Sequence, residues 1–223
     1  MNTSIIIPTW GTHHLLEKCL NSIYENTDIS KIEIIIVCNG SDDLTLKLVK
    51  QNNLTFVWYE KAIGFTKAAN SGFKLSTKSI SIIMNTDAII LPYWPQNKWI
   101  ETLIDPIVKD NSVGISGLTR MRSEWGDYIP FFCTAIQNKL FSEIGYLDED
   151  FSPGYGEDLD FCNRIKENGY KIQVVHEGIE DHNNQRVLST FPIYHPGEQS
   201  FSPEQKKECL QNAKRILERK WSK

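Results

Sequence analysis

The chain has 223 residues, of which 40% are hydrophobic and 23% are charged, and 24 basic against 28 acidic residues give a formal net charge of −4. This length and composition predict one soluble domain and exclude a disordered chain. The negative net charge argues against a nucleic-acid partner. No apolar run approaches the ~20 residues of a membrane-spanning helix, and residues 5–7 follow the start too closely to form a signal peptide, so we expect a cytoplasmic protein.

Strand-like and helix-like segments alternate through the first half of the chain. Residues 32–37 are nearly all β-branched, which is typical of a strand that is covered on both faces. The predicted strands cover residues 4–7, 32–37, 54–59 and 80–84, and the predicted helices lie near residues 12–24, 41–49 and 64–75. This alternation predicts an α/β fold with a mostly parallel sheet that is flanked by helices.

The second half of the chain is less regular. Predicted strands lie near residues 113–117, 131–136 and 171–175, and predicted helices cover residues 99–108, 157–168 and 202–221. We expect Pro106 to bend or end the first of these helices, and Gly169 to close the second. Because no repeat or linker interrupts the chain, a single domain over residues 1–223 is expected.

Asn85-Thr86-Asp87 follows the apolar strand at residues 80–84 without a break. Ligands of open α/β sheets bind outside the carboxyl ends of the strands, and magnesium often binds through one or two carboxylates plus nucleotide phosphates. Asn and Asp also favour the turn after a strand, and for an isolated Asn-x-Asp this structural interpretation is the stronger one. Whether Asn85-Thr86-Asp87 is a ligand-binding site or only a turn therefore depends on evidence from other parts of the chain.

Five blocks of the chain place polar residues or glycines at the ends of predicted elements. They are Ser4–Thr9, Glu33–Ser41, Gly64–Gly72, Met84–Asp87, and Ile144–Phe151 with Gly156–Arg164. In this order the blocks resemble the family 2 glycosyltransferases over roughly residues 3–185, in a rhamnosyltransferase-like branch with an Asn-x-Asp form of the DXD motif. The resemblance implies a Rossmann-like GT-A fold with a nucleotide-sugar-binding half (1–90), a smaller acceptor and catalytic half (91–185) and a C-terminal extension (186–223).

The resemblance also implies which residues hold the sugar donor. The expected donor-binding residues are Thr9, Asn39, Gly64, Asn70, Asn85 and Asp87. Asp87 is implied to hold a divalent cation, Mn²⁺ or Mg²⁺, and through it the donor diphosphate. A second metal ligand is expected at His182, in a late segment that resembles the family's histidine segment, although a lone histidine is more often structural or solvated.

Asp158 is the implied general base, which takes the proton from an acceptor hydroxyl. Its position on one helical stripe directs it toward the cleft, and the helix N-terminus should keep its carboxylate charged. Glu157 and Asp158 are equally typical of ordinary first-turn helix acids. Trp125, Glu157 and Asp160 are expected near the acceptor, and Asp160 is also expected to pair with Arg164 four residues later.

Together these features predict a metal-dependent inverting glycosyltransferase that moves a sugar from a UDP-, GDP- or dTDP-linked donor to a hydroxyl of a glycan or lipid-linked saccharide. Cys38 and Asn39 stand where relatives often carry acids, which leaves the base open and also permits a catalytically silent nucleotide-sugar or glycan-binding module. A sugar nucleotidyltransferase needs a Gly-rich, Arg-containing loop that residues 8–12 lack. The basic helix over residues 202–221 is expected to pack on the domain, or to touch the inner face of a membrane.

Overall fold

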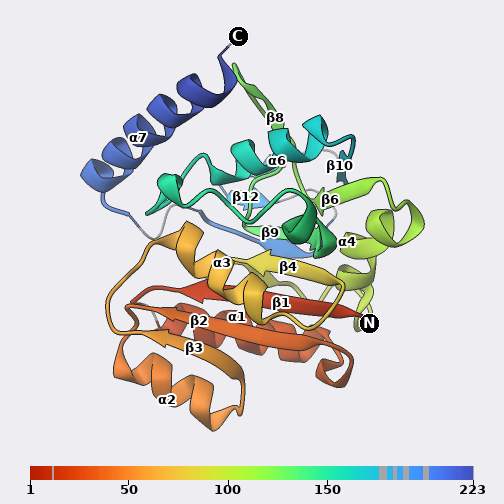
Figure 1. The fold of residues 1–223 in the computed structure, drawn as a ribbon. Helices are drawn as coiled ribbons and strands as arrows, with labels where there is room; N and C mark the ends of the chain where they lie inside the picture. The colour runs from red at the N-terminus through yellow and green to blue at the C-terminus, as the bar shows by residue number, and fades with distance from the viewer. Residues whose placement is uncertain (12, 176–179, 183–184, 188–190, 198–200, 223) are drawn as a thin grey trace.

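The computed structural model describes residues 1–223 except residues 12, 176–179, 183–184, 188–190, 198–200 and 223. Within the described residues, a seven-stranded sheet in the order β10-β6-β9-β4-β1-β2-β3 forms the centre of the molecule (Figure 1). Its strands are β1 (Thr3–Thr9), β2 (Glu33–Asn39), β3 (Thr55–Tyr59), β4 (Ile80–Met84), β6 (Val113–Gly117), β9 (Cys133–Gln137) and β10 (Lys171–Val174). Only β9 is antiparallel to its neighbours in this sheet, so the predicted mostly parallel sheet is confirmed.

Helices cover both faces of the sheet (Figure 1). They are α1 (His13–Asn26), α2 (Asp43–Gln51), α3 (Phe65–Leu75), α4 (Lys98–Lys109), α5 (Lys139–Glu143), α6 (Glu157–Glu167) and α7 (Pro203–Trp221), with 3₁₀ turns η1 (Ile29–Lys31) and η2 (Glu149–Phe151). Trp99 of α4 packs in the same cluster as Ile5, whereas Phe161 of α6 packs in the cluster of Ile6. Successive strand side chains point to opposite faces, so β1 contributes to both layers of the core.

Pro106 does not end its helix, contrary to one of the two expected outcomes. Helix α4 continues to Lys109, and the N–H of Asp110 donates to the Pro106 carbonyl over 3.0 Å. Both Pro106 and Ile107 are buried. The proline lies in the last turn of the helix, where its lost N–H bond affects one carbonyl only, and burial of this turn against the sheet outweighs that loss.

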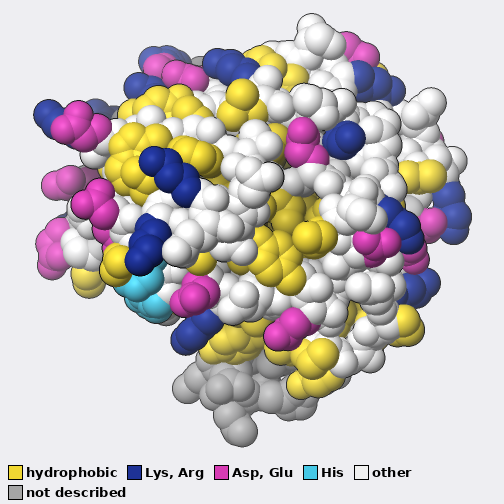
Figure 2. Space-filling model, turned by 90° about the horizontal axis from the view of Figure 1, so that it is seen from below, with side chains coloured by type: hydrophobic (Ala, Val, Ile, Leu, Met, Phe, Trp, Pro, Cys, Tyr) yellow, Lys and Arg dark blue, Asp and Glu magenta, His cyan; other side chains and the backbone are white. Residues whose placement is uncertain are grey.

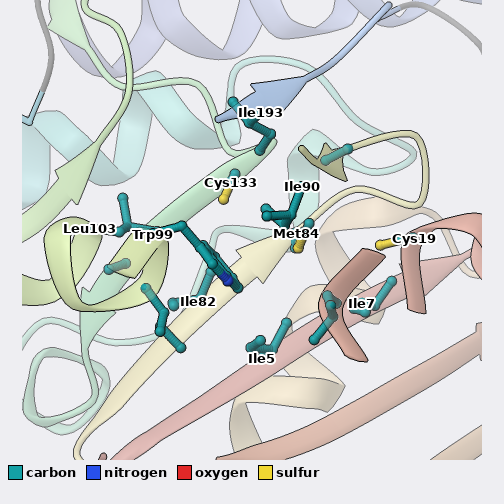
Figure 3. Close-up of a cluster of buried hydrophobic side chains, with 14 of the residues drawn as sticks. Ile5, Ile7, Cys19, Ile82, Met84, Ile90, Trp99, Leu103, Cys133 and Ile193 are labelled. Atoms are coloured by element: carbon teal, nitrogen blue, oxygen red, sulfur yellow. The ribbon is translucent and has the colours of Figure 1, made fainter. Parts of the chain in front are cut away.

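A second sheet brings the late part of the chain to the end of β4. Its order is β11-β12-β13-β5, with β5 (Ile89–Ile90), β11 (Glu180–His182), β12 (Gln185–Val187) and β13 (Ile193–Tyr194). Ile193 is paired with Ile90, and both are buried. Figure 3 shows the two side chains beside Met84 and Cys133, in the same apolar cluster as Trp99. Burial of this short strand therefore fixes the residues that follow it.

The C-terminal helix α7 packs on the domain beside α6 (Figure 1). Its Ser202 forms the capping box with Gln205, which confirms the predicted start. None of the helices in the described part of the chain is long and apolar enough to cross a bilayer. On the face drawn in Figure 2, acidic and basic side chains are interspersed with hydrophobic ones.

Candidate active site

The Asn85-Thr86-Asp87 turn lies at the carboxyl end of β4, as expected. The Asn85 N–H donates to the Phe132 carbonyl over 2.9 Å, and the Ala88 N–H donates back to the Asn85 carbonyl over 3.1 Å. Asp87 is only 7% exposed. These bonds tie the turn to the segment that precedes β9, and they hold a carboxylate at the end of the sheet.

His195 meets Asp87 across this strand end. Its Nε2 lies 3.2 Å from Asp87 Oδ1 and 3.4 Å from Asn85 Nδ2. Its ring stacks on Phe132, with the ring centroids 4.4 Å apart and the planes 7° apart. The short strand β13 ends one residue earlier and pairs with β5, which follows Asp87 in the chain. The fold therefore places His195 beside Asp87.

His182 is the histidine that the sequence favoured for this position. Its backbone belongs to β11 and pairs with Gln185, but its side chain lies outside the described residues. The sequence did not predict His195 as a site residue, because a lone histidine after a two-residue strand is not part of a recognisable motif. The one available cue was the apolar pair Ile193-Tyr194, which is far too short to reveal its pairing partner.

The chemistry of Asp87 and His195 fits a divalent cation. A carboxylate suits Mg²⁺ or Mn²⁺, and neutral imidazole is a common metal ligand. Mg²⁺ takes oxygen ligands, so the imidazole favours Mn²⁺. No group of three or more His, Cys, Asp or Glu side chains suited to a metal occurs among the described residues. Two protein ligands leave coordination positions for phosphate oxygens, which is how a substrate-linked cation is usually bound.

Thr9 and Asn39 end neighbouring parallel strands, so both lie at the same edge of the sheet as Asp87. Thr9 is buried, and its Oγ1 has no hydrogen-bond partner among the described residues. Asn39 accepts a hydrogen bond at Oδ1 from the N–H of Ile63 over 2.6 Å, which fixes the loop before α3. The structure thus brings both residues to the expected edge and uses the Asn39 amide oxygen within the protein.

Asn70 contacts the loop before η2 instead of the strand ends. Its Oδ1 accepts from the Leu147 N–H over 3.0 Å, and its Nδ2 donates to the Leu147 carbonyl and to Glu149 Oε1. The side chain is buried. With its amide engaged on both sides, Asn70 joins helix α3 to the loop that leads into η2, and its contact with a donor stays a prediction.

Asp158 lies in the first turn of α6, beside Glu157. The Asp158 carboxylate accepts from the N–H of Leu159 over 2.8 Å and from the backbone of Phe131. Because the neighbouring residue Phe132 binds Asn85, one dipeptide connects the Asp158 carboxylate to the Asp87 turn. The expected metal-binding carboxylate and the expected base therefore lie at the same end of the sheet.

Burial changes the ionisation of this pair. Desolvation raises the pKa of Asp158, although backbone N–H groups act in the opposite direction. Desolvation and then the Asp158 charge raise the pKa of Glu157, whose Oε2 has no partner among the described residues. The backbone N–H groups at the start of α6 lower the pKa of Asp158, as expected of a helix N-terminus, but desolvation outweighs them and the net pKa is raised. A raised pKa brings a carboxyl closer to the value that suits a general base near neutral pH.

Asp160 and Trp125 are engaged away from the strand ends. Asp160 is 0% exposed and pairs with Arg164 Nε at 2.9 Å, as predicted. Its carboxylate also forms an ion pair with Lys220 and accepts a hydrogen bond from Trp221, both of α7. An acceptor contact at Asp160 is therefore replaced by a contact with the C-terminal helix, which the sequence pattern could not show. Trp125 packs half-buried against the cluster between α6 and α7, and its contact with an acceptor stays a prediction.

Gly64 allows helix α3 to lie close to the loop between η2 and α6. Its φ is +86°, and an added Cβ would lie 2.7 Å from the Cα of Pro153. The next N–H, of Phe65, donates to the Pro153 carbonyl over 2.7 Å. This close approach explains why a glycine is needed here, while leaving its contact with a donor as a prediction.

Gly64→Ala should lower the free energy of unfolding by about 1–3 kcal/mol, because it adds strain at positive φ and a contact with Pro153. Gly169→Ala is the matched control, since Gly169 has a φ of +80° with no atom within 4 Å of an added Cβ. Urea unfolding of both variants separates the two effects. Equal losses in the two variants would show that the contact with Pro153 contributes nothing.

Comparison with known proteins identifies the family. Residues 4–131 match the model of glycosyl transferase family 2. Glycosyltransferase AglE of Haloferax volcanii is 29% identical over 110 residues, which are 47% of this chain and 34% of AglE. This chain therefore spans about a third of the length of that relative.

Solved structures show the same fold. A mannosyltransferase from Pyrobaculum calidifontis in complex with GDP-Man and Mn²⁺ is similar with a TM-score of 0.61 and 21% identity, over 82% of this chain and 58% of that one. TarS 1–349 of S. aureus in complex with UDP has a TM-score of 0.62 and 19% identity, over 96% of this chain and 64% of that one. These similarities confirm the expected GT-A fold. Because the family model covers more than half of the sequence, the chain belongs to glycosyl transferase family 2.

Proposed function

We propose that this chain is a metal-dependent inverting glycosyltransferase that transfers a sugar from a nucleoside-diphosphate sugar to a hydroxyl of a glycan or lipid-linked saccharide. The observation that carries the proposal is the joining of Asp87, His195 and Asp158 around Phe131-Phe132 at the end of a GT-A sheet. The rhamnosyltransferase-like branch and the Asn-x-Asp form of the DXD motif are part of this proposal. The proposal also includes a cytoplasmic location and a contact between the protein and the inner face of a membrane.

The donor is proposed to lie along the strand ends, with its base near Thr9 and Asn39 and its diphosphate at Asp87. Two structural neighbours, solved with GDP-Man and Mn²⁺ and with UDP, support a nucleotide-linked donor and a divalent cation. The residues that would hold the cation here are Asp87 and His195. When bound, such an ion neutralises charge on the departing diphosphate as a Lewis acid.

Asp158 is the proposed base for the acceptor. The acceptor oxygen attacks the anomeric carbon from the face opposite the diphosphate, and its proton passes to the Asp158 carboxylate. The bond between the anomeric carbon and the diphosphate oxygen breaks, and the nucleoside diphosphate leaves with the electron pair. Phe132 holds the His195 ring beside Asp87 by stacking, so both ends of this reaction depend on the Phe131-Phe132 segment.

Release of nucleoside diphosphate tests the proposal directly. UDP-, GDP- and dTDP-linked hexoses are supplied with simple glycosides as acceptors, with Mn²⁺ or with EDTA. We expect release with one donor class that depends on Mn²⁺ and on an acceptor. Donor binding by calorimetry without any release would overturn catalysis and support a silent nucleotide-sugar-binding module instead.

A further inference from the structure

The last turn of α7 reaches the buried carboxylate of Asp160. Lys220 Nζ lies 2.7 Å from Asp160 Oδ1, and the Trp221 indole N–H donates to the same oxygen over 3.0 Å. Arg164 occupies Oδ2 from within α6. Asp160 lies two residues after the proposed base, so the end of the chain is bound directly to the first turn of the catalytic helix.

Lys220 also binds the loop before that helix. Its ammonium lies 2.8 Å from Asp148 Oδ2 and 5.8 Å from the ring centroid of Phe151. Its side chain is only 25% exposed. Asp148 caps η2 through its contact with the Asp150 N–H. One ammonium thus joins both ends of the loop that runs from η2 to the start of α6.

Apolar side chains of α7 also pack against the same loop. Ala213, Ile216 and Leu217 of α7 share a cluster with Phe151 and Leu159. A Cβ at Gly156 would lie 3.0 Å from Ala213 Cβ and 2.9 Å from Phe151 Cε1, and Gly156 has a φ of +89°. The turn that begins α6 is therefore enclosed by η2 on one side and by α7 on the other.

We propose that Lys220 is a positioning residue for the general base. By binding Asp148 and Asp160 together, it holds the loop from residue 148 to residue 160 in one arrangement and so directs the Asp158 carboxylate. The proposal rests on the proposed function for its kinetic consequence only. A buried ion pair adds little to stability by itself, but loss of one partner leaves a buried charge uncompensated. The local structure around Asp158 should then change.

Three variants test this role. Lys220→Met removes the ammonium and keeps most of the chain length, and Lys220→Arg restores a cation. Lys214→Met is the matched control, because Lys214 is on the same helix, 61% exposed, and paired with Glu218 of that helix. The measurements are amide hydrogen exchange over residues 149–160, and kcat and donor KM with the hexose donor that the wild type uses.

Lys220→Met should increase exchange over residues 149–160 and lower kcat about tenfold or more, with donor KM within about twofold of wild type. Lys220→Arg should recover most of both losses, and Lys214→Met should match wild type. Wild-type kcat and exchange in folded Lys220→Met would overturn the proposal, as would a rise in donor KM without a fall in kcat, because that result places the effect on donor binding.

Two further arrangements keep the test decisive. If Lys220→Met does not fold, Asp148→Asn keeps the oxygen that caps η2 and removes one of the two carboxylate charges that Lys220 joins. A fall in kcat with faster exchange over residues 149–160 then supports the role, while unchanged values overturn it. If the wild type transfers no sugar, the proposed function fails. The exchange comparison then decides alone: faster exchange in Lys220→Met but not in Lys214→Met supports positioning by Lys220, and equal exchange overturns it.

Discussion

Asp158→Asn should lower kcat for sugar transfer by about 10²–10⁴-fold, which is the usual contribution of a general base, and should leave the donor KM nearly unchanged. The substitution keeps the size of the side chain and removes its ability to take a proton. Asp105→Asn is the control, because Asp105 is a half-exposed carboxylate on α4 that pairs with Lys109. Full transfer activity in Asp158→Asn would exclude Asp158 as the base.

The pH profile gives a second measurement of the same residue. Burial raises the pKa of Asp158, and that of its neighbour Glu157, so the profile reports the pair. A base must be ionised, and therefore kcat/KM should be constant above the raised pKa and fall as the pH is lowered through it. We expect the acid limb above the ordinary aspartate range near pH 4. A limb within that ordinary range would contradict the burial effect.

The sequence predicted the central sheet well because the pattern that marks each strand lies within a few neighbouring residues. Runs such as residues 32–37 are apolar on both faces, and this pattern depends on burial between two layers of helices rather than on a particular partner. Glycine and capping residues marked the ends of α6 and α7 correctly. The expectation that Pro106 ends its helix was wrong, because the rule for proline considers the lost hydrogen bond and not the burial of the turn around it.

The parts that the sequence did not predict depend on long-range pairing. His195 reaches Asp87 only because two-residue strands pair across the molecule, and such strands are too short to show a period. Asp160 was expected near the acceptor and paired with Arg164, but α7 also covers it from a late part of the chain. A helical wheel identifies neighbours within one helix and contains no information about which other helix covers them.

The expected donor-binding residues were likewise predicted in part from local pattern and in part not. Parallel pairing of β1, β2 and β4 brings Thr9, Asn39 and Asp87 to one edge of the sheet, and the alternation of elements was enough to predict this. Asn70 belongs to a matching motif but bonds to Leu147, so a motif match did not reveal the direction of its side chain. Motif order therefore pointed to one edge of the sheet, and three-dimensional contacts are needed to propose a role for each residue there.

Asp87→Asn should have the second large effect, on the cation and the diphosphate together. Binding of UDP or GDP in the presence of Mn²⁺ should weaken at least about 100-fold, and kcat/KM should fall by about 10³, since Lewis-acid stabilisation is worth several kcal/mol. Isothermal calorimetry with and without Mn²⁺ measures the first loss. The variant should bind the nucleotide equally weakly in both conditions, because the metal-linked part of the binding free energy is absent.

The two histidines provide the control that separates the structural assignment from the sequence assignment. His195→Ala should weaken Mn²⁺-dependent nucleotide binding about 10–100-fold, because it removes the imidazole 3.2 Å from Asp87. His182→Ala should leave that binding unchanged if His195 is the ligand. The reverse result, with a loss in His182→Ala alone, would return the ligand role to His182. A loss in both variants would mean that each histidine contributes, in which case the late part of the chain supplies two ligands to a cation that Asp87 holds from β4.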